Sequence, residues 1–115
     1  MTMTDCLFCR IIEKTIPAEI VLERDNLIAF RDINPQAPTH VLIIPRKHIA
    51  TIDDLQGEDT LLVGELIQAA REIAATERLG DGYRLVFNCG KQGGQDVYHI
   101  HLHLLGGRSM KWPPG

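Results

Sequence analysis

The sequence predicts an α+β domain: a mainly antiparallel sheet of about five strands, with one short and one long helix. Three observations support this fold class. Apolar residues recur at helical spacing in two segments, short runs rich in Val, Ile and Leu are bounded by turn residues, and 115 residues suit one compact domain spanning 1–115.

The first helix is predicted in the segment CLFCRIIE, where Leu7 and Ile11 are one turn apart. Thr4 or Asp5 is the expected N-cap, and the helix should end before Pro17. The long helix is predicted from Glu58 to Leu79, and the glycines after it should end it. Its apolar face would contain Leu62, Leu66, Ala69 or Ala70, Ile73 and Leu79, and the terminating glycines are Gly80 and Gly82.

Short apolar segments predict the strands. Two of them flank Arg24-Asp25-Asn26, which is typical of a hairpin. The segment HVLIIP predicts a buried strand that Pro45 stops, and Tyr83 to Asn88 predicts a fourth strand. The last strand is expected from Tyr98 to Leu105, where histidines alternate with apolar residues.

Charge and hydropathy narrow the classes of partner. The net charge is −3 and the basic residues are scattered, so we expect no nucleic-acid partner. The longest apolar run, Val41 to Ile44, is far too short to cross a membrane, and the first ten residues lack the features of a signal peptide. Three cysteines without a secretion signal predict reduced thiols and a cytoplasmic location. The expected partner is a small molecule.

Three of the five histidines occupy every second position of the last predicted strand. His99, His101 and His103 would share one face, and the apolar residues between them would face the core. The outer two lie about 13 Å apart on an extended strand, too far to bind one zinc ion at about 2.0–2.1 Å. The three histidines are therefore expected to perform different tasks. Solvated surface histidines and a metal site for an adjacent pair are the alternatives to phosphoryl chemistry.

A glycine-rich loop precedes the histidines. Gly90, Gly93 and Gly94 allow backbone N–H groups to approach a phosphate closely, and Asn88 comes just before them. A neutral imidazole is a competent nucleophile toward phosphorus when its other nitrogen is held by an acceptor. The combination favours phosphoryl chemistry through a covalent intermediate.

The residues also resemble a known family. The segment His99 to Leu105 matches the signature of the histidine triad (HIT) superfamily, in which three histidines alternate with apolar residues. The segments DINPQAPTHVLIIPRKHI, GGQDVYHIHLHLLGGR and WPPG resemble its Hint branch, the histidine triad nucleotide-binding proteins. The resemblance implies a HIT-like fold and a homodimer that joins two sheets into a larger one.

The resemblance further implies a purine nucleoside phosphoramidase, which cleaves the P–N bond of adenosine or guanosine 5′-monophosphoramidates without an organic cofactor. His101 would be the nucleophile and carry the nucleotidyl intermediate, and His103 would hold and polarise the phosphate. The carbonyl of His99 would fix the tautomer of His101, and His40 would support the histidine cluster.

Further residues match nucleotide-binding positions of the family. The apolar base pocket would comprise Leu7, Phe8, Ile11, Phe30 and Ile33; Asp32 would hold the ribose; the phosphate and leaving-group loop would comprise Asn88, Gly94, Gln95 and Asp96; and Trp112 would approach the site of the partner. From the residues alone, Asp32 can equally initiate a turn, the helix residues can be core, and His40 can be structural.

Asp96 departs from the family pattern, in which serine is common. An ionised carboxylate cannot donate a hydrogen bond and repels a phosphate oxygen. Asp96 should therefore be turned from the phosphate or carry a proton when substrate is bound. This leaves the group that protonates the leaving amine open.

Cys6 and Cys9 form half of a zinc site, and His48 and His99 are the candidates for the other half. Some histidine triad proteins bind a structural zinc ion in this pattern. Two free buried thiols and a redox pair are the alternatives, although no βαβ pattern, the usual context of a redox motif, precedes the two cysteines.

Two alternatives to the phosphoramidase remain at this stage. One is a dinucleoside polyphosphate hydrolase of the same superfamily, and the other is a nucleotide-binding regulatory or partner module. The LLGGR continuation and the WPPG end favour the Hint branch over the first, and the intact triad argues against the second.

Overall fold

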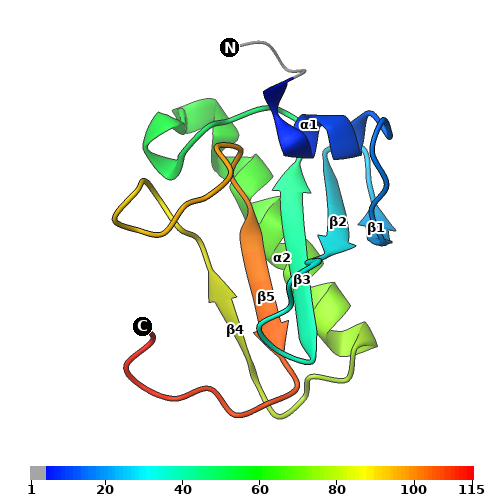
Figure 1. Ribbon diagram of the computed structural model, residues 1–115, viewed down its shortest axis with the longest axis vertical. Helices are drawn as coiled ribbons and strands as arrows, with labels where there is room; N and C mark the ends of the chain where they lie inside the picture. Colours follow the sequence, from blue (N-terminus) through cyan, green and yellow to red (C-terminus); the bar gives the residue numbers. More distant parts are fainter. Residues whose placement is uncertain (1–4) are drawn as a thin grey trace.

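The computed structural model of the chain describes residues 5–115 and confirms the predicted α+β class. A five-stranded antiparallel sheet has the order β1-β2-β3-β5-β4, and α2 packs along one of its faces (Figure 1). The elements are α1 (Leu7–Ile12), β1 (Ile20–Glu23), β2 (Leu27–Arg31), β3 (Thr39–Pro45), α2 (Thr60–Thr76), β4 (Tyr83–Val86) and β5 (Leu102–Gly106), with 3₁₀ turns at Ile52–Asp54 and Gly57–Asp59 before α2.

Side chains from the two faces of the sheet form two separate cores. The core on the α2 side combines alternate residues of the strands with Leu66, Ala70 and Ile73 of the helix. The core on the opposite face combines the remaining strand residues with the apolar side of α1. Every residue of β3 is buried, as expected for a central strand covered on both faces. The predicted core role of Ile100, Leu102 and Leu104 is confirmed, since all three lie in the α2-side core.

The N-cap of α1 differs from the prediction. Cys6 is the N-cap, and its Sγ accepts a hydrogen bond from the backbone N–H of Cys9. Asp5 precedes the cap, and Thr4 lies outside the described residues. A thiol can accept the orphan N–H of a first helical turn, although it is a weaker acceptor than the oxygens usually found there.

Helix α2 is shorter than predicted at both ends. It begins at Thr60 and ends at Thr76, and Arg78 adopts the left-handed conformation with φ 60°. The N–H of Leu79 donates to the carbonyl of Ala74, which closes the helix as a Schellman motif. Glycine usually occupies this left-handed position, so the arginine gave no signal for it. No helix among residues 5–115 is long and apolar enough to cross a membrane.

The last strand also starts later than predicted. Ladder pairing of β5 with β3 begins at Leu102, opposite Ile43, and not at Tyr98. Before that point the N–H of Ile100 donates to the carbonyl of Ile49, in the segment that follows β3. Pro45 ends β3 and has no N–H to extend the ladder. The side chains of Ile100, Leu102 and Leu104 still lie in the α2-side core, so the predicted apolar face of this segment holds.

Candidate active site

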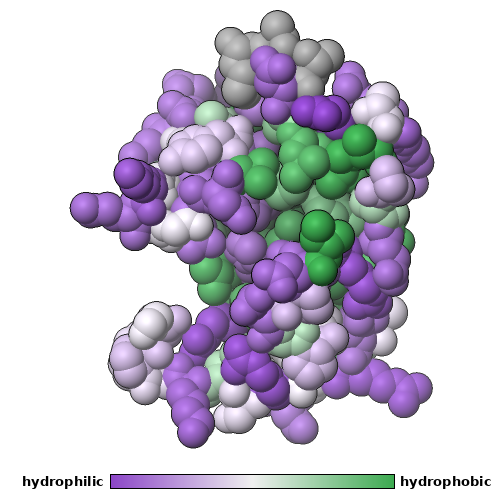
Figure 2. Space-filling model, viewed as in Figure 1, coloured by the Kyte–Doolittle hydropathy of each residue, from purple (hydrophilic) through white to green (hydrophobic). Residues whose placement is uncertain are grey.

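A cavity of about 600 Å³ opens on the face of the sheet opposite α2, beneath α1. Figure 2 shows apolar side chains gathered on this face. The volume lies within the range typical of sites for small molecules. Ten predicted site residues line it: Leu7, Phe8, Ile11, Phe30, Asp32, Ile33, His40, Asp96, His101 and His103.

The ring of His101 is held from behind by the backbone of the same segment. Its Nδ1 donates a hydrogen bond of 2.8 Å to the carbonyl oxygen of His99. A carbonyl oxygen can only accept, so the proton of the neutral ring is on Nδ1 and the lone pair is on Nε2. Phe8 packs edge-on against this ring, with centroids 5.0 Å apart. The neutral ring of His101 therefore presents the lone pair of Nε2 at the cavity.

A chain of hydrogen bonds fixes the ring of His103 in the opposite tautomer. The backbone N–H of Gln36 donates to His40 Nδ1 at 3.0 Å, so the proton of neutral His40 is on Nε2. That nitrogen lies 2.9 Å from His103 Nδ1 and donates to it. The proton of His103 is then on Nε2. His101 and His103, whose ring centroids are 4.9 Å apart, thus offer a lone pair and an N–H donor respectively.

Burial keeps these supporting histidines neutral. Burial, with smaller contributions from the neighbouring His101 and His40 rings, lowers the pKa of His103 to about 4. Burial also lowers the pKa of His40, against the opposing charge of Asp32. Both rings therefore retain one donor and one acceptor at neutral pH, as the hydrogen-bond chain requires.

Asp32 initiates the turn that its sequence context allowed, and it also lies at the cavity. One carboxylate oxygen accepts from the N–H of Asn34 at 2.8 Å and so initiates a turn. The other lies 3.5 Å from His40 Nε2, and the residue lines the cavity. The turn fixes the carboxylate at the end of β2 while leaving it in reach of a bound molecule.

Cationic side chains contribute almost no free charge to the cavity. Arg31 is the one Lys or Arg among the residues that line it, and its guanidinium forms two hydrogen bonds with Glu77 and one with Glu19. Asp96 contributes an exposed carboxylate whose Oδ1 lies 3.8 Å from His101 Nε2. A bound phosphate would therefore meet imidazoles, with the carboxylate of Asp96 nearby, rather than ammonium or guanidinium groups.

Four predicted nucleotide-binding residues do not line this cavity: Asn88, Gly94, Gln95 and Trp112. Gln95 is buried and holds the glycine-rich loop, since its amide accepts from Gly90 N–H and donates to the carbonyls of Ala50 and Val97. The amide of Asn88 donates to the carbonyl of Gly93 at 2.7 Å. Trp112 lies in the C-terminal tail with 85% of its surface exposed.

The glycine-rich loop differs from the phosphate cradle that its sequence predicts. The N–H of Gly90 donates to Gln95, and the N–H of Gly94 donates to the carbonyl of Lys91. Neither group is therefore directed at a ligand. The glycines have geometric roles instead: Gly94 has φ 84°, and a Cβ on Gly93 would lie 2.3 Å from the carbonyl oxygen of Cys89.

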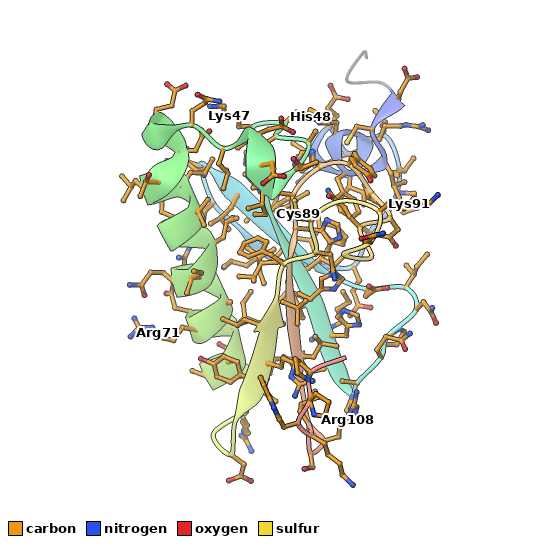
Figure 3. All side chains as sticks on the ribbon, turned by 90° about the vertical axis from the view of Figure 1, so that its left-hand side faces the viewer. Lys47, His48, Arg71, Cys89, Lys91 and Arg108 are labelled. Carbon is orange, nitrogen blue, oxygen red and sulfur yellow. The ribbon has the colours of Figure 1, made fainter. Side chains whose placement is uncertain are left out.

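The thiols of α1 meet two histidines in a second cluster. Cys6, Cys9, His48 and His99 each offer one ligand atom, and the four atoms lie within 4.8 Å of one another. His48 lies on the segment after β3, at the end of the sheet where α1 begins (Figure 3). Among residues 5–115, His99 belongs to this cluster, and His103 forms a separate one with Asp32 and His40.

The geometry of this cluster fits a tetrahedral zinc ion. Zinc bonds of 2.0–2.3 Å place sulfur and nitrogen ligands about 3.6 Å apart. The sulfur of Cys9 lies 3.3 Å from His48 Nδ1 and 3.6 Å from His99 Nδ1, and Cys6 Sγ lies 3.4 Å from His99 Nδ1. The other nitrogen of His99 donates to the carbonyl of Pro45 at 2.8 Å, which leaves the Nδ1 lone pair for a metal.

Sequence reasoning anticipated the His99 carbonyl behind His101, through the family resemblance, but missed the backbone groups that set the tautomers of two other histidines. The N–H of Gln36 fixes His40, and the carbonyl of Pro45 fixes His99. Main-chain partners carry no residue-type signal, so no pattern could have identified them. The pairing of Arg31 with Glu77 was also missed, because it joins the end of β2 to the end of α2, 46 residues apart.

The sequence matches the HIT domain family over residues 13–110. The chain belongs to the HIT family. It is 52% identical, over 96% of this chain and 97% of the relative, to an uncharacterized HIT-like protein of Synechococcus elongatus. A HIT family hydrolase from Legionella pneumophila has the same fold with a TM-score of 0.94 and 59% identity, covering 96% of this chain and 99% of that one.

A second solved HIT structure bears on the thiol cluster. A zinc-bound histidine triad family protein from Mycobacterium smegmatis superimposes with a TM-score of 0.82 at 32% identity, covering 93% of this chain and 78% of that one. Zinc is thus present in a relative that shares the fold of this HIT protein.

Proposed function

We propose that this HIT protein is a purine nucleoside phosphoramidase of the Hint branch, which hydrolyses the P–N bond of adenosine or guanosine 5′-monophosphoramidates. The observation that carries the proposal is the hydrogen bond from His101 Nδ1 to the carbonyl of His99. It leaves Nε2 as an unprotonated nucleophile at a cavity of nucleotide size.

The two chemical steps balance overall, because the leaving amine takes up one proton in the first step and the attacking water gives up one in the second. In the first, a bond forms between His101 Nε2 and phosphorus, and the P–N bond to the amine breaks. The amine leaves with that electron pair and takes up a proton. In the second step water attacks phosphorus, gives up a proton, and releases His101 and the nucleoside monophosphate. The Nε2–H of His103 is placed to donate to a phosphate oxygen as charge develops on it.

The remainder of the cavity has the chemistry expected for a nucleoside. The apolar residues of α1 and β2 offer a surface for a purine ring, and Phe8 and Phe30 pack edge to face with centroids 5.4 Å apart. The carboxylate of Asp32, held at the cavity by its turn, can accept from ribose hydroxyls. For Asn88, Gly94 and Gln95 we propose an indirect role, since their groups shape the loop that carries Asp96.

The charge of the cavity favours a phosphoramidate over a dinucleoside polyphosphate. A phosphoramidate monoester carries one negative charge, whereas a polyphosphate bridge carries several. The cavity offers two carboxylates and an arginine already paired with two glutamates. Phosphate chains are usually met by unpaired Arg, Lys or metal ions.

Comparison of two substrates tests this proposal. An adenosine phosphoramidate should be turned over with a much higher kcat/KM than a diadenosine polyphosphate. The reverse order would identify a dinucleoside polyphosphate hydrolase. Binding of nucleotide without turnover of either compound would identify the protein as a nucleotide-binding partner module.

We further propose that the thiol cluster holds a structural zinc ion. The donor set, the separations of 3.3–3.6 Å and the tautomer of His99 support it. Such an ion would tie α1, which carries one wall of the cavity, to the end of the sheet. It would supply stability and take no part in the chemical steps.

We also propose a homodimer formed through α2 and the β4 edge of the sheet. Leu61 and Ile67 of α2 are exposed, and β4 is an edge strand. Arg84 of β4 donates to the carbonyl of Lys111 at 2.7 Å. This bond holds the C-terminal tail, which contains Trp112, near this edge. Sedimentation equilibrium of the protein should give twice the mass of the chain; a monomer at micromolar concentration would contradict the dimer.

A further inference from the structure

Asp96 is the one carboxylate at the cavity that is not engaged in fixing the fold. Its side chain is 84% exposed, and Oδ1 lies 3.8 Å from His101 Nε2. Within residues 5–115 it forms an ion-pair contact with this histidine alone. Asp32, in contrast, uses one oxygen for the turn at Asn34.

Asp96 lies near the part of the cavity where we expect the leaving amine. If the apolar wall and Asp32 hold the nucleoside, as proposed above, the amine extends from phosphorus toward the open rim. Asp96 is at that rim, because it lines the cavity and is exposed. Its proximity to His101 Nε2 places its charge within a few ångströms of the phosphorus that this nitrogen attacks.

Basic side chains within reach do not neutralise this charge. Arg31 is committed to Glu77 and Glu19. Figure 3 labels Lys91 on the same glycine-rich loop, and no ion pair joins it to Asp96 among the described residues. The rim of the cavity where the amine leaves therefore carries an uncompensated negative charge.

We propose that Asp96 makes the enzyme selective for phosphoramidates whose leaving amine carries a second, positively charged group. This inference rests on the proposed phosphoramidase function and adds the substrate class. The carboxylate attracts the distant ammonium and repels a carboxylate at the same place. The covalent steps at His101 and the release of the amine are unchanged.

The size of the effect follows from the exposure of Asp96. Ion pairs in contact with solvent change an equilibrium by about 2- to 5-fold, and salt screens them. The attraction acts on bound substrate and transition state alike, so it should lower KM and leave kcat nearly unchanged. A selectivity that weakens as ionic strength rises would be its signature.

Three adenosine 5′-phosphoramidates of similar length test the inference. Their leaving amines are 1,4-diaminobutane, pentylamine and 4-aminobutyrate, which place a positive, a neutral and a negative group at the far end. The kcat/KM of each is measured at low and high salt for the unaltered protein, Asp96→Asn and Asp96→Ser. The control is Asp53→Asn, which removes the same charge from an exposed site in the turn before α2.

The informative quantity is the ratio of kcat/KM between two substrates, because differences in amine basicity cancel when variants are compared. The ratio of the positive to the neutral substrate should fall about 2- to 5-fold in both Asp96 variants and stay unchanged in Asp53→Asn. An unchanged ratio in the Asp96 variants would overturn the inference while leaving the proposed function intact. If the unaltered protein cleaves none of the three compounds, both the proposed function and the selectivity are contradicted.

Discussion

The carbonyl oxygen of His99 lies 2.8 Å from Nδ1 of His101, while the ring of His99 points to the thiols of Cys6 and Cys9. One residue therefore contacts both clusters, through its backbone on one side and its imidazole on the other. This relationship explains how histidines two residues apart can perform different tasks.

Replacement of the two thiols tests the zinc site. The unaltered protein, purified without chelator, should contain one zinc ion per chain by elemental analysis, and Cys6→Ser/Cys9→Ser should contain none. The melting temperature of the double variant should fall by about 5–10 °C, because α1 loses its anchor. Cys89→Ser is the matched control and should keep both zinc and stability. Absence of zinc from the unaltered protein would show that this cluster is not a zinc site.

Removal of the proposed hydrogen-bond donor to the phosphate should lower kcat more than removal of the residue that orients this donor. His103→Ala should lower kcat by about 10²- to 10³-fold, the usual effect of losing one donor to a developing negative charge. His40→Ala should lower kcat less, because it removes only the partner that orients His103. Both variants should still form the covalent adduct on His101. Full activity of His103→Ala would show that this ring does not act on the phosphate.

Asp96→Ser addresses the departure from the family pattern. Serine can donate a hydrogen bond to the leaving amine and does not ionise, so turnover should persist with a changed dependence on pH. The measurement is kcat/KM for a neutral phosphoramidate between pH 5 and pH 9. Loss of all turnover would make Asp96 indispensable and would contradict this expectation.

The sequence predicted the parts of this fold that depend on side-chain pattern. Alternation placed Ile100 and Leu102 in the core and His101 on the opposite face, and both assignments hold. The start of β5 could not be predicted, because it depends on the register in which β5 pairs with β3, which places Leu102 opposite Ile43. The same limit applies to the left-handed turn at Arg78, where packing outweighs the usual preference for glycine.

The candidate site shows the same difference between features set by side-chain pattern and features set by the backbone. Ten residues that line the cavity, and the contact of the His99 carbonyl with His101, were anticipated from the resemblance, whereas the backbone groups of Gln36 and Pro45 were not. Gln95 shows the difference, since its amide matches a ligand-binding position but is used to hold the loop. Neutral tautomers, too, depend on carbonyls and N–H groups that any residue type could supply.

Buried neutral histidines should make stability depend on pH in one direction. The pKa of His103 is lowered to about 4 in the folded chain, against about 6.5 in an unfolded chain. The unfolded state therefore binds protons first as pH falls, and stability that is complete above pH 6.5 is lost progressively toward pH 4. Melting temperatures of chelator-treated protein should follow this course, and those of His103→Gln should fall less steeply. Equal slopes for the two proteins would show that His103 does not contribute.

The central claim is that His101 attacks phosphorus, and trapping tests it most directly. The protein is mixed with a labelled adenosine phosphoramidate, quenched in the pre-steady state, and digested for mass spectrometry. The account predicts a nucleotidyl group on the peptide that contains His101, located on that residue by fragmentation and absent from His101→Ala. An adduct on His103, on His99 or on any other residue would contradict it.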